Sequence, residues 1–271
     1  MSATLAVFSW EVRKLAAQKR TFVGLGAAVV YALAFVITLA LQSGGPTEEP
    51  FGALIRTTGL ALPLVLLTFA TFFGAPLVVA LVAGDIVATE DTHRTLKLIA
   101  TRSVSRTSIY AGKTFAAGGY CLAALAALLV TSLVGASVVW GLHPLLNLSG
   151  VTLSTGEGLA LVALAYAVFL LPVLVIAAVA LFLSTVTRNS AAALVGALLV
   201  ALGFQLLAAL PGIDGLRDYL LPQQFEAWQG LFRSPIEWDR IVRAAIVCPL
   251  LAALPLTGGL LYFRRRDIAG E

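Results

Sequence analysis

Long apolar runs separated by short polar segments set the pattern of this chain of 271 residues. Six runs lack Asp, Glu, Lys and Arg over the length of a membrane span. An α-helix needs about 20 apolar residues to cross roughly 30 Å of hydrocarbon, so each run can span a bilayer once. The pattern predicts an all-α polytopic membrane protein with one transmembrane domain over residues 1–271. The expected spans cover about residues 21–41, 59–83, 114–142, 159–183, 190–210 and 241–263.

The composition agrees with the membrane prediction and narrows the class of protein. Hydrophobic residues make up 59% of the chain, charged residues make up only 12%, and the mean hydropathy is +0.95. These values leave too few polar groups to cover a soluble globule of this size. Cys121 and Cys248 both fall inside expected spans, which predicts free apolar thiols rather than a disulfide framework.

The distribution of basic residues predicts the orientation in the membrane. Lys and Arg concentrate before the first span, after the second span and at the C-terminal end, whereas acidic residues dominate the connections on the other side. Basic residues beside short loops stay in the cytoplasm, so both termini of this multi-pass protein are expected on the cytoplasmic side of the cell membrane. The net charge of +4 follows from this asymmetry and does not indicate a nucleic-acid partner.

Residues 3–20 are expected to form an amphipathic helix on the membrane surface. The apolar residues that recur at helical spacing on one face are Leu5, Phe8, Val12 and Leu15. Basic residues lie off this face, and Trp10 is expected at the depth of the lipid headgroups. The alternative is an ordinary terminus whose basic charges only fix the topology.

The polar segment 84–113 is rich in charged residues and lies between two runs that contain none. Its middle part, residues 89–102, is expected to form a short helix. Thr89 or Asp91 would cap the N-terminus of this helix. Acidic residues stand near that end and basic residues stand toward the other, which is the arrangement that the helix dipole favours.

Leu96 and Ile99 stand three residues apart in this expected helix and would form one apolar ridge. Lys113, at the start of the third span, is expected to snorkel to the lipid headgroups. A solvated loop whose basic residues only enforce the topology is the alternative interpretation of the whole segment.

The order of residue types in this segment resembles that of a known family. In chain order, the segment has an acidic residue, then Thr-Leu with an apolar pair, then a basic residue. Ser-Arg follows, and Gly-Lys stands at the start of the next span. The positions are Glu90, Thr95, Leu96, Leu98, Ile99, Arg102, Ser105, Arg106, Gly112 and Lys113. The order resembles the cytoplasmic coupling segment of exporter-like type-2 ABC transporter permeases. The likeness extends to the interfacial helix, the six spans and the long outer connection before the last span. At Arg94 and Val104 the family more often has Gly and Pro.

The resemblance implies that this coupling helix fits a cleft on a separate ABC ATP-binding subunit. ATP and magnesium would bind to that partner, so this chain would hold no cofactor and would not be an enzyme. Gly112, Lys113 and Thr114 end like a phosphate-binding loop, but position 107 is Thr where that loop needs Gly. The residues implied to bind the partner are Thr89, Glu90, Asp91, Thr92, His93, Arg94, Thr95, Leu96, Lys97, Ile99 and Arg102.

The connection 211–239 contains an apolar pattern of its own. Four residues follow helical spacings of four, three and four: Leu221, Phe225, Trp228 and Phe232. They predict an amphipathic outer helix that lies in the interface or dips back into the bundle. In the resembling family, helices at this place cap the outer side of the route, which implies an outer gate or interface. Simple anchoring by aromatic side chains is the alternative.

The spans lack the ionisable residues that ion-coupled transporters generally need, and no set of catalytic or metal-binding groups converges. A transporter of this kind must take its energy from a partner. The expected function is the transmembrane subunit of an ATP-driven exporter of a hydrophobic or amphipathic compound, paired with a second copy or a homologue. Substrate and direction follow from the resemblance. The alternative is a non-transporting membrane anchor or sensor that recruits a cytoplasmic protein, and missing catalytic groups disfavour an intramembrane enzyme.

Overall fold

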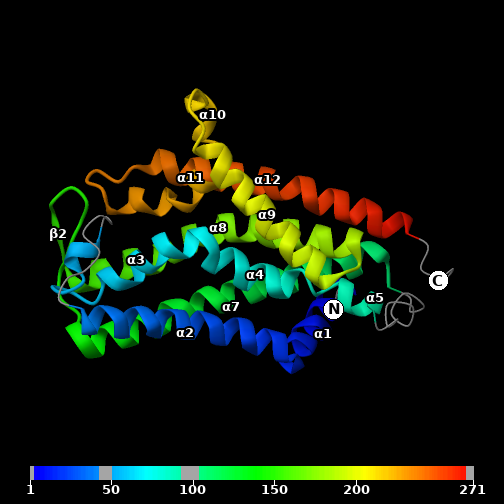
Figure 1. Cartoon of the computed structure of the whole chain (residues 1–271), viewed down its shortest axis with the longest axis horizontal. Helices are drawn as coiled ribbons and strands as arrows, with labels where there is room; N and C mark the ends of the chain where they lie inside the picture. Colours follow the sequence, from blue (N-terminus) through cyan, green and yellow to red (C-terminus); the bar gives the residue numbers. More distant parts are fainter. Residues whose placement is uncertain (1–2, 43–50, 93–103, 267–271) are drawn as a thin grey trace.

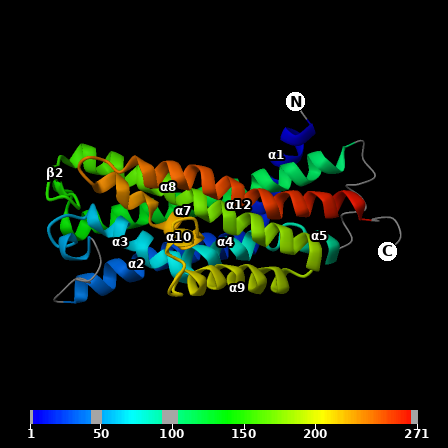
Figure 2. The same ribbon diagram turned by 90° about the horizontal axis from the view of Figure 1, so that it is seen from above.

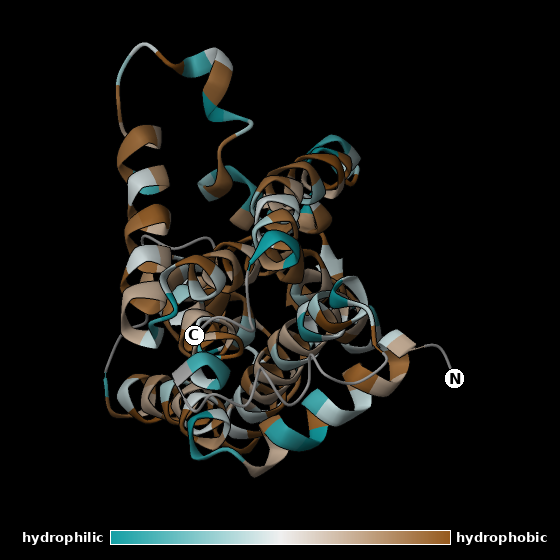
Figure 3. Cartoon of the chain, turned by 90° about the vertical axis from the view of Figure 1, so that its right-hand side faces the viewer, coloured by the Kyte–Doolittle hydropathy of each residue, from teal (hydrophilic) through white to brown (hydrophobic). Residues whose placement is uncertain are grey.

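The protein is an all-α polytopic membrane protein (Figure 1). The computed structural model describes residues 3–42, 51–92 and 104–266. Among these residues, six helical stretches are long and apolar enough to cross a membrane. Large apolar side chains are exposed along them, for example Val30 of the first and Leu250 of the last. Such surfaces suit contact with lipid, and Figure 3 shows hydrophobic residues along the long helices.

The six spans and the shorter elements follow one another in chain order. The spans are α2 (Lys19–Leu41), the continuous stretch Ala61–Asp91, α7 (Arg106–Trp140), α8 (Thr155–Thr187), α9 (Ser190–Ala208) and α12 (Trp238–Arg265). The shorter elements are α1 (Ala3–Ala17), η1 (Gly52–Leu54), β1 (Leu145–Leu146), β2 (Thr152–Leu153), α10 (Asp214–Arg217), α11 (Leu221–Phe225) and η3 (Ala227–Phe232). All six spans overlap the runs expected from the sequence. The third and fourth helices extend beyond the expected spans, to 35 and 33 residues.

The second span changes its helical geometry in the middle. It consists of α3 (Ala61–Phe69), a π-helical turn η2 (Ala70–Gly74), α4 (Ala75–Ala83) and, after a turn, α5 (Ala88–Thr92). Pro76, in the first turn of α4, has no N–H to donate to the preceding turn, and its ring would clash with a carbonyl there. The wider π turn accommodates this proline without ending the span.

Helix α8 is the central element of the bundle. It packs against α12, α9, α4 and α7, and half of its most apolar window is buried. Helices α1 and α5 and the C-terminal end of α12 lie at one end of the bundle, and the β1/β2 hairpin lies at the other (Figures 1 and 2). Helix α9 is the least buried span and carries α10 away from the side of the bundle.

The N-terminal helix ends earlier than expected and turns a charged residue to the bundle. It ends at Ala17, and the extended backbone of Gln18 separates it from α2. Of the four residues on the expected apolar face, Leu15 is buried and Phe8 is half-buried, whereas Leu5 and Val12 are exposed. The buried positions of α1 are Glu11 and Leu15. The helix therefore directs a charged residue at the bundle and leaves half of its apolar face outside.

A close approach between backbones sets the position of α1. A Cβ atom added to Gly112 of α7 would lie 2.5 Å from Cγ1 of Val7 and 3.1 Å from the backbone nitrogen of Phe8. Only a residue without a side chain fits at this crossing. The crossing brings the polar face of α1 against the first turns of α7.

The segment 221–232 is folded onto the bundle, but not as one helix. It forms α11 and the 3₁₀ helix η3, which meet at Glu226. All four of the residues at helical spacing are buried: Leu221, Phe225, Trp228 and Phe232. The ring of Phe225 contacts that of Phe169 on α8, with centroids 5.0 Å apart, and Phe51 contacts the rings of Trp228 and Phe232. Of the two expected placements, the structure has the one in which the segment dips back into the bundle.

The β1/β2 hairpin is attached to this segment through Asn147. Its Oδ1 accepts hydrogen bonds from the backbone N–H groups of Ser149 and Val151, and its Nδ2 donates to Oγ of Ser234 at 2.7 Å. The N–H of Leu148 donates to the carbonyl oxygen of Phe232 at 2.8 Å. The buried side chain of Asn147 therefore closes the hairpin and binds Ser234, just after η3, while the backbone of Leu148 holds the end of η3.

Replacing Trp228 by Ala should lower the free energy of unfolding by about 3–5 kcal/mol, because it leaves a cavity beside the rings of Phe51 and Phe232. Trp238→Ala is the matched control, because Trp238 is 56% exposed whereas Trp228 is 1% exposed. The unfolding of both purified variants in mixed micelles measures the difference. Equal losses of stability in the two variants would contradict the packing described for this segment.

Candidate functional site

The sequence resemblance predicts a coupling region within the polar segment 84–113. The structure describes the first part of this segment, residues 84–92. It contains a turn, residues 84–87, and the short helix α5. The rest of the expected helix 89–102 lies outside the described residues, and so does its apolar ridge. The expected partner-binding residues outside the described part are His93, Arg94, Thr95, Leu96, Lys97, Ile99 and Arg102.

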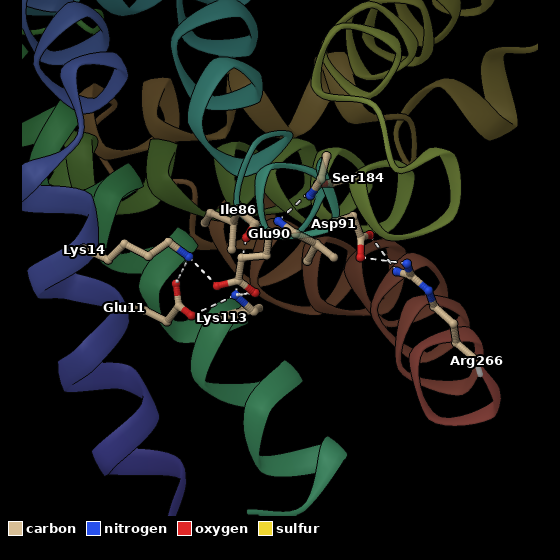
Figure 4. Close-up of polar contacts among 10 residues, drawn as sticks. Glu11, Lys14, Ile86, Glu90, Asp91, Lys113, Ser184 and Arg266 are labelled. Atoms are coloured by element: carbon tan, nitrogen blue, oxygen red, sulfur yellow. Dashed lines mark hydrogen bonds and ion pairs between the residues drawn. The ribbon is translucent and has the colours of Figure 1, made fainter. Parts of the chain in front are cut away.

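Lys113 is fully buried, with none of its side chain exposed. Its Nζ lies 2.7 Å from Oε1 of Glu11 and 2.7 Å from Oε2 of Glu90, and it donates a hydrogen bond to the carbonyl oxygen of Ile86 at 3.3 Å (Figure 4). The expectation that this lysine snorkels to the headgroups is wrong. Two carboxylates inside the bundle supply its counter-charge, so the side chain has no need to reach water.

Lys14 closes a ring with the same two carboxylates. Its Nζ lies 2.5 Å from Oε1 of Glu90 and 3.1 Å from Oε2 of Glu11 (Figure 4). Each of the four carboxylate oxygens therefore faces one ammonium group. We call these four residues, Glu11, Lys14, Glu90 and Lys113, the four-charge ring. It joins α1, α5 and α7, and its formal charges cancel.

The electrostatics of Lys14 show which effect dominates in the ring. Burial by itself would lower the pKa of this lysine, because a charged ammonium loses hydration. The negative charges of Glu90 and Glu11 and their hydrogen bonds outweigh that effect, so the pKa of Lys14 is raised above its usual value. Lys14 therefore remains charged throughout the physiological pH range.

Asp85 makes a second set of contacts one turn away from the ring. Its buried carboxylate pairs with Arg20 of α2 and accepts hydrogen bonds from the hydroxyls of Thr89 and Ser190, each at 2.5 Å. Ser190 is the first residue of α9. Asp85 thereby connects the turn before α5 to the start of two other spans.

The N-terminus of α5 is capped from another helix. Oγ of Ser184 on α8 accepts hydrogen bonds from the backbone N–H groups of Val87 and Ala88, at 3.3 and 3.0 Å. The sequence favoured Thr89 or Asp91 as the cap. The structure instead has Thr89 donating to Asp85 and Asp91 bonded to Arg266. Capping by Ser184 satisfies the same orphan donors and also fixes α5 to the central helix.

Asp91 forms a bidentate pair with Arg266 at the end of α12. The two oxygen–nitrogen distances are 2.6 and 2.7 Å, and both side chains are nearly buried. Arg106 of α7 donates from Nη1 to the carbonyl oxygens of Arg264 and Arg266, at 2.8 and 2.5 Å. The last turn of α12 is therefore held by α5 and α7 together.

The stretch 84–92 is thus bonded to all the other spans. Its contacts reach α2 and α9 through Asp85, α7 through Glu90, α8 through Ser184 and the end of α12 through Asp91. It also reaches α1 through Glu90. Glu90 and Asp91, which were expected to bind a partner, bind the chain's own helices. The sequence placed Lys113 at the start of the third span and Glu11 in the N-terminal helix, but no pattern in it pairs the two residues.

The contacts of this site attach helices to one another. Within residues 3–42, 51–92 and 104–266, no three His, Cys, Asp or Glu side chains are grouped to hold a metal ion. The expected outer residues, among them Phe225 and Trp228, lie in the segment beside the β1/β2 hairpin, at the opposite end of the bundle (Figure 1). They take no part in this site.

Lys113→Met should reduce the free energy of unfolding by about 3–5 kcal/mol, because it leaves two buried carboxylates with one ammonium group. Adding Glu90→Gln restores a ring of zero net charge, so the double variant should regain most of that loss. The exposed Lys19 offers the control, and Lys19→Met should change the stability by about 0.5 kcal/mol or less. Denaturation in mixed micelles measures all three, and a double variant no more stable than Lys113→Met would contradict the ring.

Comparison with known proteins gives a family without an assigned activity. No curated protein matches the chain. A family model described as a protein of unknown function (DUF2705) matches residues 54–269. The match includes Glu90 and Lys113 and excludes Glu11 and Lys14, so the family boundary divides the four-charge ring. Because the match covers well over half of the sequence, the chain belongs to the DUF2705 family.

Proposed function

We propose that this chain is the transmembrane subunit of an ATP-driven, exporter-like type-2 ABC transporter. In this proposal, the segment 89–102 contacts a separate ATP-binding subunit, which binds ATP and magnesium. The observation that carries the proposal is the attachment of the stretch 84–92 to all the other spans by buried charges and hydrogen bonds. The order of residues through Lys113 that resembles a coupling segment supports the same role.

The attachment would turn a movement of the segment into a movement of the bundle. A soluble subunit that pushes on the residues after α5 acts on a helix whose two acidic side chains are already paired. Glu90 pairs with Lys14 and Lys113, and Asp91 pairs with Arg266. A buried ion pair cannot be stretched gradually at low cost, because a separated buried charge costs several kcal/mol. Small displacements of α5 would therefore carry α1, α7 and the end of α12 with them.

The hydroxyl of Tyr31 lines a cavity suited to a hydrophobic cargo. Among the polar residues of the spans, Thr71 donates to the carbonyl oxygen of Leu67 and Tyr166 to that of Pro63. The hydroxyl of Tyr31 is buried and has no hydrogen-bond partner among the described residues. It lines an apolar cavity of about 160 Å³ beside the π turn of the second span. This cavity supports a cargo with an apolar body and a hydrogen-bond acceptor.

The same proposal sets the topology and the assembly. The end of the bundle that carries α1 and α5 would face the cytoplasm, with both termini there, because basic residues gather at that end. A second copy or a homologue would pair with this chain in the cell membrane. The low burial of α9 supports such a pairing, since it leaves a long apolar helix uncovered within the chain.

Co-purification with an ATP-binding protein encoded beside this chain tests the proposal. Leu96→Asp should abolish that association while leaving insertion into the membrane intact, because it places a charge in the expected apolar ridge. Glu90→Gln should retain the association but lower ATP-dependent transport about tenfold, because it weakens the attachment of α5. Transport is measured in proteoliposomes with a fluorescent phospholipid and with rhodamine 6G.

Glu157→Gln is the matched control, because Glu157 is exposed at the start of α8 and glutamine can keep its capping interaction with Ser154. This variant should transport like the wild-type chain. Failure of any ATP-binding protein to co-purify would contradict the coupling assignment. A stable complex without ATP-dependent movement of either probe would favour the anchor or sensor.

A further inference from the structure

An apolar groove runs between α7 and α12, with α8 as its floor. Its volume is about 470 Å³, and it is lined by residues 114–122 of α7, 170–181 of α8 and 248–256 of α12. The two outer helices touch at one end of the groove, where the rings of Tyr110 and Phe263 lie 5.8 Å apart. Small residues such as Gly118, Ala178 and Ala252 line the rest and leave the space open.

The groove starts at the depth where the four-charge ring ends. Thr114, the first residue of its α7 wall, follows Lys113 directly, and α1 crosses α7 at Gly112. From Thr114 to Leu122 the helix advances about 12 Å. The hydrocarbon of one bilayer leaflet is about 15 Å thick, half of the whole core. The groove therefore matches the depth of one leaflet and the course of one acyl chain.

Basic side chains lie beyond the end of the groove at which Tyr110 and Phe263 meet. Arg264 is exposed and forms no ion pair with another described residue. It follows Leu256 by eight residues, which places it about 12 Å further along α12 and within about a quarter turn of the groove wall. Arg106 lies at the same end, and both of its hydrogen bonds to α12 use Nη1, which leaves its other donors for a phosphate.

We propose that this groove is a lipid-binding site for one anionic phospholipid. One acyl chain lies in the groove, and the phosphate lies against Arg264 and Arg106. The positive charge of Arg264 and Arg106 selects an anionic headgroup. The depth of the groove selects an acyl chain rather than a compact molecule. This site does not depend on the proposed transport function, since it uses residues outside the stretch 84–92.

Two pairs of variants separate the chain site from the headgroup site. Gly118→Leu fills the groove without a backbone clash, because a Cβ at Gly118 would have its nearest contact at 3.5 Å, with Leu174. Gly203→Leu adds the same side chain on α9, where nothing lies within 4 Å of the added Cβ. Arg264→Gln is paired with Arg265→Gln, since Arg265 lies about half a turn from Leu256 and faces away from the groove.

Native mass spectrometry of the full chain, equilibrated with equal amounts of phosphatidylglycerol and phosphatidylcholine in micelles, measures the bound lipid. The wild-type chain should retain one phosphatidylglycerol. Gly118→Leu should lower the occupancy of bound phosphatidylglycerol about tenfold relative to Gly203→Leu, because the leucine side chain takes the space of the acyl chain. Arg264→Gln should lower the preference for phosphatidylglycerol about tenfold, because a charge-assisted hydrogen bond is lost, whereas Arg265→Gln should keep it.

Ala252→Leu, on the opposite wall, repeats the filling test if Gly118→Leu does not fold. Three outcomes would overturn the proposal: no lipid retained by the wild-type chain, equal retention in the filled and control variants, or detergent as the only occupant of the groove. Equal binding of phosphatidylcholine, unchanged by Arg264→Gln, would overturn the anionic headgroup.

Discussion

The neutral ring formed by Glu11, Lys14, Glu90 and Lys113 is the constraint on which this end of the bundle depends. Three of its charges are removed from water, and the side chain of Lys14 is 22% exposed. Each charge is tolerated because two opposite charges lie within ion-pair distance. The ring therefore joins α1, α5 and α7 near the crossing of α1 and α7. Four apolar residues of similar volume can pack equally well at these positions. The ring is therefore better explained by the specific arrangement of helices that it requires than by a gain in the free energy of unfolding.

The two ends of the protein are held by different physical interactions. At the α5 end, charges and hydrogen bonds connect segments that are distant in sequence, including the two Asp91 bonds to Arg266. At the hairpin end, distant segments are connected by aromatic packing around Trp228 and by the side-chain amide of Asn147. Apolar packing tolerates small shifts, whereas paired buried charges have few alternative arrangements. Under the proposed function, this difference suits the α5 end to contact with the ATP-binding subunit.

The spans could be predicted from the sequence because the length of an apolar run is a local property. The partners of Lys113 could not be predicted from the sequence. Glu11 stands 102 positions away, and helical periodicity does not indicate which helices meet. The apolar spacing in α1 likewise did not show which side meets the bundle: Glu11 and Leu15 are buried, whereas Leu5 and Val12 are exposed. The spacing of Phe225 and Trp228 identified their common burial, but the break at Glu226 leaves two short helices instead of one.

Hydrogen–deuterium exchange of the backbone amides of residues 87–91 in the wild-type chain tests the central claim most directly. If buried charges and the Ser184 cap make this stretch part of the bundle, these amides should exchange as slowly as those around Ser184 in α8. Exchange as fast as that of the exposed turn at Gly150 would mean that the stretch opens independently of the helices, and it would contradict the account.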